Sequence, residues 1–393
     1  MPDINYYSDS FFGGIFLGRA WLPGNNEGAG GGPSLIVVSG DQVFDATLNG
    51  PTCSAFLERS DFRDRLSAVL ATRPTASFQD LLAASFDRSS HPSRMRLLAP
   101  VDFQCIKAAG VTFAASMLER VIEERAAGDP KEARKIRQSI SHRLGKDISK
   151  ITPGSAEAEE LKRILIAENL WSQYLEVGIG PYAEIFTKAP IMSAVGYGEE
   201  VGIHPESKWN NPEPEVVLVA NSRSEILGVT LGNDVNLRDF EGRSALLLGK
   251  AKDNNASCAI GPLIRLFDDT FGLEQVRQIE VRLEIEGEDG FSLSEKSSMR
   301  EISRDVLDLI EHAAGVAHQY PDGFVLFTGT LFSPTKDRAE KGLGFTHRVG
   351  DLVTISSAEL GSLVNRVNTS DKAAPWTFGV NALIENLRMR ALL

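Results

Sequence analysis

The hydrophobic pattern changes along the chain, and each stretch predicts a different kind of structure. Over the first hundred residues, the apolar runs GGIFLGRAWL and PSLIVVSGDQVFDAT indicate strands, while SDFRDRLSAVLAT and SFQDLLAAS indicate short helices. A glycine cluster, Gly28 to Gly32, lies between the two strands. Because Pro33 and a strand follow it, this cluster lacks the helix N-terminus that a phosphate loop needs. We therefore expect a hairpin turn there.

From Val111 to about Val177 the pattern becomes helical. VTFAASMLERVIEERAA places its apolar side chains on one stripe, with charged residues opposite. A second helix, rich in Lys and Arg, is expected to begin at Asp129-Pro130, and SAEAEELKRILIAENLWSQYLEV predicts a third. Such an insertion is either a plain helical hairpin or a mobile cap over a site.

After Gly180 the pattern favours strands. EPEVVLVANS, SEILGVTLGND, QVRQIEVRLEIEG, GFVLFTGTLFSP and GDLVTISSAELG are rich in Val, Ile and Thr and are separated by turn residues. One helix, SMREISRDVLDLIEHAAG, interrupts them, and PWTFGVNALIENLRMRALL predicts a C-terminal amphipathic helix. A chain of 393 residues usually holds two domains. We predict an α+β, mainly β protein, with a small mixed domain over residues 1–95 and a β-rich domain over 96–393 that carries the helical cap at about 111–178.

Composition narrows the function classes. The net charge of −12 argues against a nucleic-acid partner, which requires a surplus of Lys and Arg. No basic amphipathic stretch and no long apolar run suggests a membrane partner. The three cysteines, Cys53, Cys105 and Cys258, are far apart and odd in number, and the N-terminus is not typical of a signal peptide. These features predict a cytoplasmic location.

Three carboxylates are placed to converge. Glu213 and Glu215 stand two apart where a strand begins, so their side chains share one face, and Asp234 ends the next strand. Antiparallel pairing would bring the three together, and an all-oxygen set suits Mg²⁺, Mn²⁺ or Ca²⁺ rather than zinc. Paired glutamates on a strand are, however, more often solvated than ligated. The spacing alone therefore leaves both interpretations open.

Two further positions have alternative roles. Lys250, in LLLGKAKDNN, is expected at the end of an apolar strand and is either a surface lysine or a base whose pKa is depressed by a nearby cation. Thr330, in FTGTLF, is either structural or a ligand for a carboxylate. The sequence contains no G-x-S-x-G, C-x-x-C or Walker motif, and its histidines lack a metal-type spacing.

Several of these segments together resemble the fumarylacetoacetate hydrolase family. The resemblance covers most of residues 97–367, in order, through LLAPVDFQCIKAAGVTF, EIFTKAP, GYGEEVGIHPESKWNNPEPEVVLVA, LGVTLGNDVNLRD, LLLGKAKDNNASCAIGP, VLFTGTLFSP and GDLVTISSAELGSLVNRV. It implies a β-roll catalytic domain and an Mg²⁺-type ion held by an E-x-E pair and a downstream aspartate. Those positions are Glu213, Glu215 and Asp234. The family's lysine is assigned to Lys250, its arginine to Arg238 and its threonine to Thr330.

Two departures from the family pattern refine this expectation. Hydrolytic members have a histidine and a glutamate that activate water; here those positions read Ser116 and Glu119. Because serine has no basic form near neutral pH, C–C bond hydrolysis is disfavoured. Glu184 stands where hydrolytic members usually have an apolar residue, which resembles the 2-keto-3-deoxypentonate (arabinonate or xylonate) dehydratases and implies a fourth metal ligand or an acid/base group.

The resemblance implies dehydration of a 2-keto-3-deoxypentonate to 2-ketoglutarate semialdehyde (2,5-dioxopentanoate) through a metal-stabilised enolate. Lys250 is the expected base or enolate stabiliser and Glu119 the expected acid, and Arg238 and Thr330 would orient the substrate. Arg238 could instead support Asp234. The alternatives are a C–C hydrolase of acylpyruvates or 2,4-diketo-3-deoxy sugar acids, and a non-catalytic metal-binding member. A homodimer or homotetramer is also implied.

Overall fold

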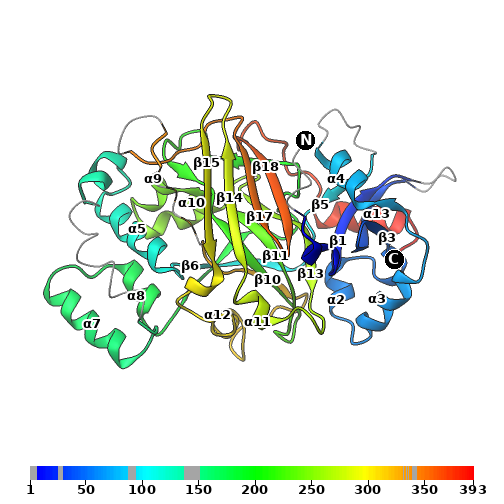
Figure 1. Ribbon diagram of the computed structural model, residues 1–393, viewed down its shortest axis with the longest axis horizontal. Coiled ribbons are helices and arrows are strands. Elements are labelled where there is room, and N and C mark those ends of the chain that lie inside the picture. The colour runs from blue at the N-terminus through cyan, green and yellow to red at the C-terminus, as the bar shows by residue number, and fades with distance from the viewer. Residues whose placement is uncertain are drawn as a thin grey trace.

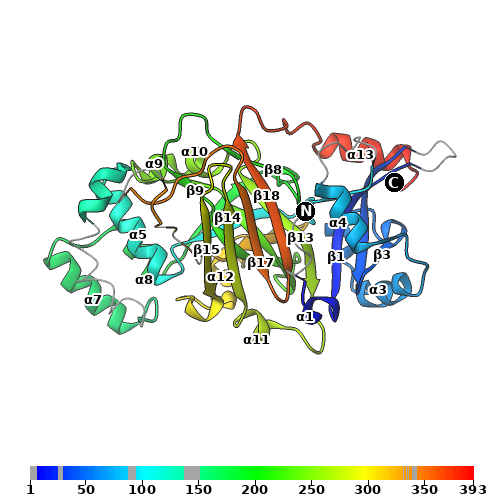
Figure 2. The same ribbon diagram turned by 45° about the horizontal axis from the view of Figure 1, so that its top comes forward.

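The computed structural model describes residues 7–24, 30–86, 94–136, 151–330, 332, 334, 336–338 and 343–393. Its elements form an elongated molecule in which two sheets occupy the middle (Figure 1). The small N-terminal elements lie at one end and helices α5, α7 and α8 at the other (Figures 1 and 2). Within the described residues, no helix combines the length and apolar character needed to cross a membrane.

The larger sheet has eleven strands and runs through both halves of the molecule. Its order is β4-β3-β2-β1-β13-β11-β10-β16-β6-β7, and β5 pairs with β1. The strands are β1 (Ile15–Leu22), β2 (Gly32–Ser39), β3 (Gln42–Asp45), β4 (Ala76–Ser77), β5 (Arg96–Leu98), β6 (Cys105–Gly110), β7 (Glu184–Ala189), β10 (Pro214–Ala220), β11 (Ile226–Asp234), β13 (Cys258–Leu266) and β16 (Phe324–Phe327). Because β1 pairs with β13, strands of the first 95 residues extend the sheet that contains β10 and β11. A domain boundary near residue 95 stays a prediction.

A five-stranded sheet packs against this one, and a two-stranded ribbon completes the β structure. The order of the five is β15-β14-β17-β18-β8, and β9 pairs with β12. Their bounds are β8 (Glu200–Ile203), β9 (Asn210–Asn211), β12 (Asn236–Leu237), β14 (Glu280–Glu286), β15 (Ser292–Ser298), β17 (Leu352–Ser357) and β18 (Gly361–Thr369). The described chain is thus a mixed α/β fold with several sheets.

From Val216 to Ala220 strand β10 is apolar, because both of its faces are buried there. Val216 and Leu218 belong to the core cluster that contains residues of β14 and β17, while Val217 and Val219 face a second core lined by α2 and α3. Successive side chains of a strand point to opposite faces, so a strand between two cores has few positions for polar residues. The carboxylates therefore stand where β10 begins.

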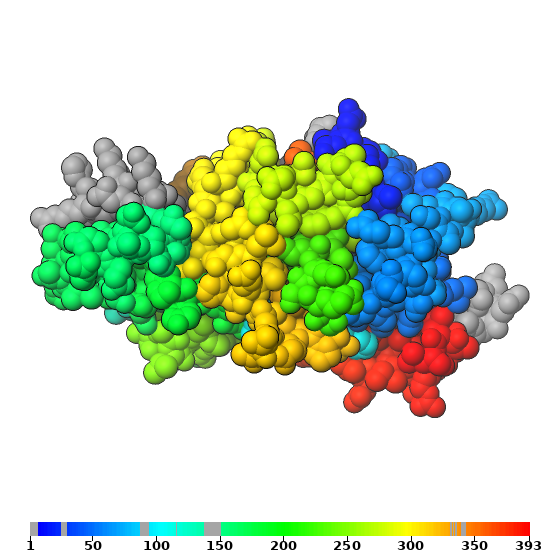
Figure 3. Space-filling model, turned by 90° about the horizontal axis from the view of Figure 1, so that it is seen from below, coloured from blue at the N-terminus to red at the C-terminus, as the bar shows by residue number. Residues whose placement is uncertain are grey.

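The helices lie around the sheets. They are α1 (Asp9–Phe12), α2 (Cys53–Leu57), α3 (Phe62–Leu70), α4 (Phe78–Phe86), α5 (Ala114–Arg125), α7 (Ala156–Ala167), α8 (Gln173–Ile179), α9 (Arg238–Glu241), α10 (Leu248–Lys252), α11 (Leu273–Val276), α12 (Val306–Ala313) and α13 (Val380–Met389). Seen from below, the green, yellow and blue parts of the chain follow one another along the molecule, and the red C-terminal part lies beside the blue N-terminal part (Figure 3).

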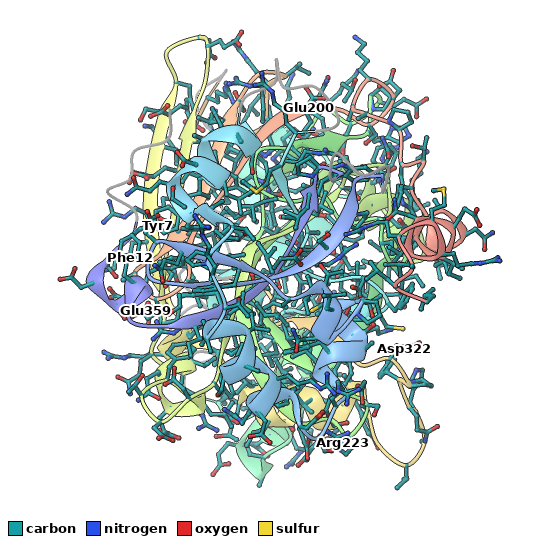
Figure 4. All side chains as sticks on the ribbon, turned by 90° about the vertical axis from the view of Figure 1, so that its right-hand side faces the viewer. Tyr7, Phe12, Glu200, Arg223, Asp322 and Glu359 are labelled. Atoms are coloured by element: carbon teal, nitrogen blue, oxygen red, sulfur yellow. The ribbon has the colours of Figure 1, made fainter. Side chains whose placement is uncertain are left out.

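The N-terminal segment is fastened to the smaller sheet. Figure 4 shows Tyr7, Phe12 and Glu359 close together at this side of the molecule. The Ser362 hydroxyl contacts the Tyr7 hydroxyl at 3.2 Å, and the Tyr7 ring packs edge-on against Phe11. This contact joins the start of the chain to β18.

The predicted patterns agree with the described elements in most places. The β1–β2 hairpin is confirmed, although residues 25–29 of its glycine-rich connection lie outside the described part. The predicted Lys- and Arg-rich helix is helical over residues 130–136, and residues 137–150 also lie outside that part. The third cap helix was predicted as one element but is two, α7 and α8. The helical conformation ends just before Asn169, whose φ is +57°. Ser172 then caps α8 by accepting a hydrogen bond from the Tyr174 N–H.

Candidate metal centre

The three predicted carboxylates converge at the paired ends of β10 and β11. The antiparallel register sets Pro214 opposite Asn233, and the Asp234 N–H donates to the Glu213 carbonyl oxygen at 3.0 Å. One carboxylate oxygen from each of Glu213, Glu215 and Asp234 lies within 4.8 Å of the others. All three residues are at most 3% exposed. The hairpin register therefore brings the three carboxylates together, as the sequence spacing predicted.

Buried cations surround these carboxylates. The Lys252 ammonium contacts Glu213 and lies 3.1 Å from Asp234 Oδ2, and the Lys188 ammonium lies 3.1 Å from Asp234 Oδ1. Arg120, from cap helix α5, donates to the other oxygen of Glu213. Charges this deeply buried persist only when they are paired. In this cluster the buried lysine and arginine side chains offset the negative charge of the carboxylates, next to the cap helix α5.

The donor set fits a hard divalent cation. Burial, with the nearby charges of Asp234 and Glu213, raises the pKa of Glu215 well above its ordinary value. Glu215 Oε2 accepts a hydrogen bond from the Gly329 N–H at 2.7 Å. Like charges crowded in this way are stabilised by a cation, and carboxylate oxygens are the ligands that Mg²⁺ prefers. Glu213, Glu215 and Asp234 are the residues that would hold it.

The lysine that contacts the carboxylates is Lys252, whereas Lys250, the lysine chosen from the sequence, lies beside His204. The segment expected to be an apolar strand is instead a 3₁₀ turn, Ala245–Leu247, followed by helix α10. Residues two apart on a helix point to nearly opposite sides. Lys250 is consequently exposed, 3.4 Å from His204 Nε2, while Lys252 is buried against the carboxylates.

The carboxylates hold Lys252 in its charged form. Burial alone would lower the pKa of Lys252, but Asp234, Glu213 and Glu241 together raise that pKa above its ordinary value. The depressed pKa that would produce a neutral lysine base is therefore absent in this arrangement. An ammonium group here instead stabilises negative charge.

Glu184 lies at the edge of the cluster, on the first residue of β7. It pairs across the sheet with Gly110, and a Cβ at that glycine would lie 1.9 Å from Glu184 Oε2. The glycine thus makes room for the carboxylate. Burial and the charge of Glu241 raise the pKa of Glu184 to about 7. Among described residues, the group of carboxylates whose oxygens lie within 4.8 Å of one another does not include Glu184. Its position therefore favours a role in proton exchange rather than membership of the three-carboxylate group.

The raised pKa of Glu184 predicts a pH-dependent stability difference. Between pH 4.5 and about 7 the unfolded chain ionises this carboxyl while the folded chain keeps it protonated, so Glu184 lowers stability as pH rises through this window. Glu184→Gln removes that loss. We expect its stability relative to wild type to increase by about 3 kcal/mol from pH 4.5 to 7.5. Urea unfolding in EDTA at both pH values measures this, and an equal difference at both pH values would contradict the shift.

The other predicted residues are close by but engaged elsewhere. The Ser116 hydroxyl donates to the Phe113 carbonyl at 2.9 Å, inside the first turn of α5. Glu119 pairs with Arg238 at 3.1 Å. Thr330 Oγ1 lies 3.4 Å from the carbonyl oxygen of Pro214, the residue that separates the two glutamates in sequence. Thr330 is thus next to the carboxylates, whereas Ser116 bonds to the N-cap residue of its own helix and Glu119 pairs with Arg238 of α9.

Arg238 does not contact Asp234. Support of Asp234 was one of the two roles predicted for this arginine. Its Nε donates to Glu123 at 2.6 Å, and its guanidinium lies 4.5 Å from the centre of the Trp209 ring. Arg238 is 2% exposed. Support of Asp234 is therefore not the contact that Arg238 makes, and its role in substrate binding stays a prediction.

Sequence reasoning missed four buried charged residues of this cluster: Lys188, Arg120, Glu123 and Glu241. A signal for Lys188 existed, because it stands four residues after Glu184 on β7 and therefore shares its face. The other three pair across α5, α9 and the start of β10. Their association depends on how the cap packs, which no local spacing records.

Comparison with known proteins agrees with this arrangement. Residues 180–368 match the family described as fumarylacetoacetate (FAA) hydrolase, C-terminal. The chain is 32% identical over 193 residues to a 2-dehydro-3-deoxy-D-arabinonate dehydratase of Saccharolobus solfataricus, covering 48% of this chain and 60% of that protein. It is 31% identical over 196 residues to a probable 2-keto-3-deoxyxylonate dehydratase of Haloferax volcanii, covering 50% and 64%. The matches span less than two thirds of either relative.

The fold is shared with solved structures. Two structures of a 2-keto-3-deoxy-D-arabinonate dehydratase, one apo and one complexed with magnesium and 2,5-dioxopentanoate, align with TM-scores of 0.62 and 0.60. Each alignment covers 90% of this chain and 98% of the other at 21% identity. The region matched by the family, residues 180–368, thus belongs to the fumarylacetoacetate hydrolase family. Its sequence resembles the 2-keto-3-deoxypentonate dehydratases of that family.

Proposed function

We propose that this chain is a divalent-metal-dependent dehydratase that converts a 2-keto-3-deoxypentonate to 2,5-dioxopentanoate and water. The observation that carries the proposal is the buried convergence of Glu213, Glu215 and Asp234 beside a charged lysine. The names of two relatives about 31% identical to the chain support the substrate class. The magnesium and product in one structure with this fold support the cofactor.

Glu213, Glu215 and Asp234 would hold the cation. When bound, Mg²⁺ supplies Lewis acidity that polarises the 2-keto group and makes a C3 proton acidic. The Lys252 ammonium, fixed within the cluster, stabilises negative charge that develops on the substrate carbonyl oxygen. The role assigned to Lys250 on sequence grounds thus passes to Lys252, as an electrostatic stabiliser.

Glu184 is suited to move the proton. A carboxyl with a pKa of about 7 is ionised in part and protonated in part at neutral pH, so it both accepts and donates readily. In the proposed reaction Glu184 takes a proton from C3 and gives it to the hydroxyl that leaves C4 as water, so that a C3–C4 double bond forms. Transfer of a proton from C5 to C3 then converts this enone to the C4–C5 enol, which tautomerises to the aldehyde of 2,5-dioxopentanoate. Glu119, which the sequence favoured as the acid, is instead ion-paired with Arg238. We therefore place the acid/base role on Glu184.

Hydrolysis of a C–C bond is the alternative that the site supports less well. It requires a base for the attacking water, and Ser116 stands where hydrolytic family members have a histidine. In the described part of the chain, no histidine hydrogen-bonds to the three carboxylates; His204 contacts Lys250 and His347 contacts Asp351. A lyase reaction needs no attacking water, so it fits these residues better.

One assay separates the candidate functions. The full chain is incubated with Mg²⁺ and each C4 epimer of a 2-keto-3-deoxypentonate, and products are identified by mass spectrometry. We expect a five-carbon aldehyde acid lighter than the substrate by one water, and no product when EDTA is present. Pyruvate plus an acid from an acylpyruvate or 2,4-diketo-3-deoxy acid would favour the hydrolase instead. Turnover of neither substrate by the Mg²⁺-bound protein would contradict both reactions and leave a binding role.

A further inference from the structure

We propose that a chain of buried ion pairs couples the cation site to cap helix α5, with Arg120 and Arg238 as positioning residues for Glu213. The chain of contacts runs from Glu213 through Arg120 and Glu123 to Arg238. This inference rests on the proposed use of a divalent cation. It adds that the cap and the cation stabilise one another.

Arg120 is the point where the cap meets the site. Its Nη2 donates to Glu213 Oε1, and its Nη1 lies 2.7 Å from Glu123 Oε2 and 3.0 Å from Glu241 Oε2. The Arg120 side chain is only 10% exposed. One guanidinium from α5 therefore joins carboxylates from the start of β10, from its own helix and from α9.

Arg238 continues the chain of contacts on the far side of Glu123. The second oxygen of Glu123 accepts a hydrogen bond from Arg238 Nε at 2.6 Å, and Arg238 Nη2 lies 3.1 Å from Glu119 Oε2. Glu119 and Glu123 are four residues apart and so share one face of α5. Helices α5 and α9 lie on the same side of the sheets in both ribbon views (Figures 1 and 2). The two glutamates thus fasten the cap to the helix that follows β12.

The two oxygens of Glu213 have separate partners, which gives Arg120 its effect. Oε2 faces Lys252, which also contacts Asp234, and Oε1 is held by Arg120. A cation shared by the three carboxylates needs Glu213 to keep one oxygen turned towards Asp234. By holding the opposite oxygen, Arg120 fixes that orientation. Loss of such a supporting hydrogen bond typically weakens metal binding about 10- to 100-fold.

Coupling of this kind works in both directions. If a docked α5 orients Glu213 for the cation, then a bound cation must stabilise docked α5 by the same free energy. Arg238 provides the sharper test, because it contacts none of the three carboxylates and acts on Glu213 only through Glu123 and Arg120.

The first experiment measures cation affinity. Mg²⁺ is titrated calorimetrically into full-length, EDTA-stripped wild type, Arg238→Met, Arg238→Lys and Arg265→Met. Arg265 is a buried arginine of β13 whose guanidinium donates to the Ser10 and Glu359 carbonyls, so it serves as a matched control. We expect Kd to rise about 2- to 30-fold in Arg238→Met, to recover in part in Arg238→Lys, and to change less than about 2-fold in the control.

The second experiment measures how firmly α5 is docked. Hydrogen exchange in peptides covering residues 114–125 is followed in wild type with and without Mg²⁺. We expect Mg²⁺ to slow exchange in α5, and this protection to vanish in Arg238→Met. If wild type binds Mg²⁺ but α5 exchange is unchanged, or Arg238→Met keeps wild-type affinity, the coupling is wrong and the proposed function stands. If wild type binds no divalent cation, both are wrong.

Discussion

Lys252→Met lowers kcat for the 2-keto-3-deoxypentonate about 100- to 1,000-fold, whereas Lys250→Met stays within about 2-fold of wild type. The larger loss is that expected when a preorganised charge is removed from a buried reacting centre. Lys252 contacts Glu213 and Asp234 inside the protein, and Lys250 faces solvent beside His204. Steady-state kinetics at saturating Mg²⁺ checks both variants.

A folding defect in Lys252→Met is distinguished by cation affinity. Removing the ammonium leaves two carboxylates without that partner, so Mg²⁺ should bind the variant at least as tightly as wild type. Tight binding with lost turnover supports a charge-stabilising role. A variant that turns over normally, or an inactive Lys250→Met beside an active Lys252→Met, would contradict the assignment.

Glu213→Gln abolishes Mg²⁺ binding and turnover together. Glu213 is the residue shared by the carboxylate set, Lys252 and Arg120, so a neutral amide removes the charge on which all three depend. Because disturbing even a supporting partner costs about 10- to 100-fold in affinity, loss of the ligand itself should exceed about 100-fold. Calorimetry and product assays measure the two effects.

The matched control is Glu225→Gln. Glu225 is an exposed glutamate near the opposite end of the same hairpin, where it pairs with Arg223. Exposed pairs of this kind contribute about 0–1 kcal/mol to stability, so binding and turnover should remain near wild type. Full activity in Glu213→Gln would show that the metal centre has been misplaced.

The segment that carries Lys250 and Lys252 shows where prediction of local structure from the sequence failed. The apolar run LLLGKAK was interpreted as a strand, but the chain forms a 3₁₀ turn and a short helix there. Short apolar runs do not distinguish the two structures by periodicity. A helix places residues two apart on nearly opposite sides, so Lys252 is buried against the carboxylates while Lys250 is exposed.

The sequence by itself determined the strand pattern around the site, the three converging carboxylates and the resemblance to the fumarylacetoacetate hydrolase family. These follow from local periodicity and from a hairpin register, which neighbouring residues dictate. The tertiary structure alone decided which lysine is buried, that Arg238 contacts Glu123 instead of Asp234, and that Arg120 reaches Glu213 from the cap. The physical reason is that burial and ion pairing depend on packing between elements 18 to 115 residues apart in sequence, and no local pattern encodes those contacts.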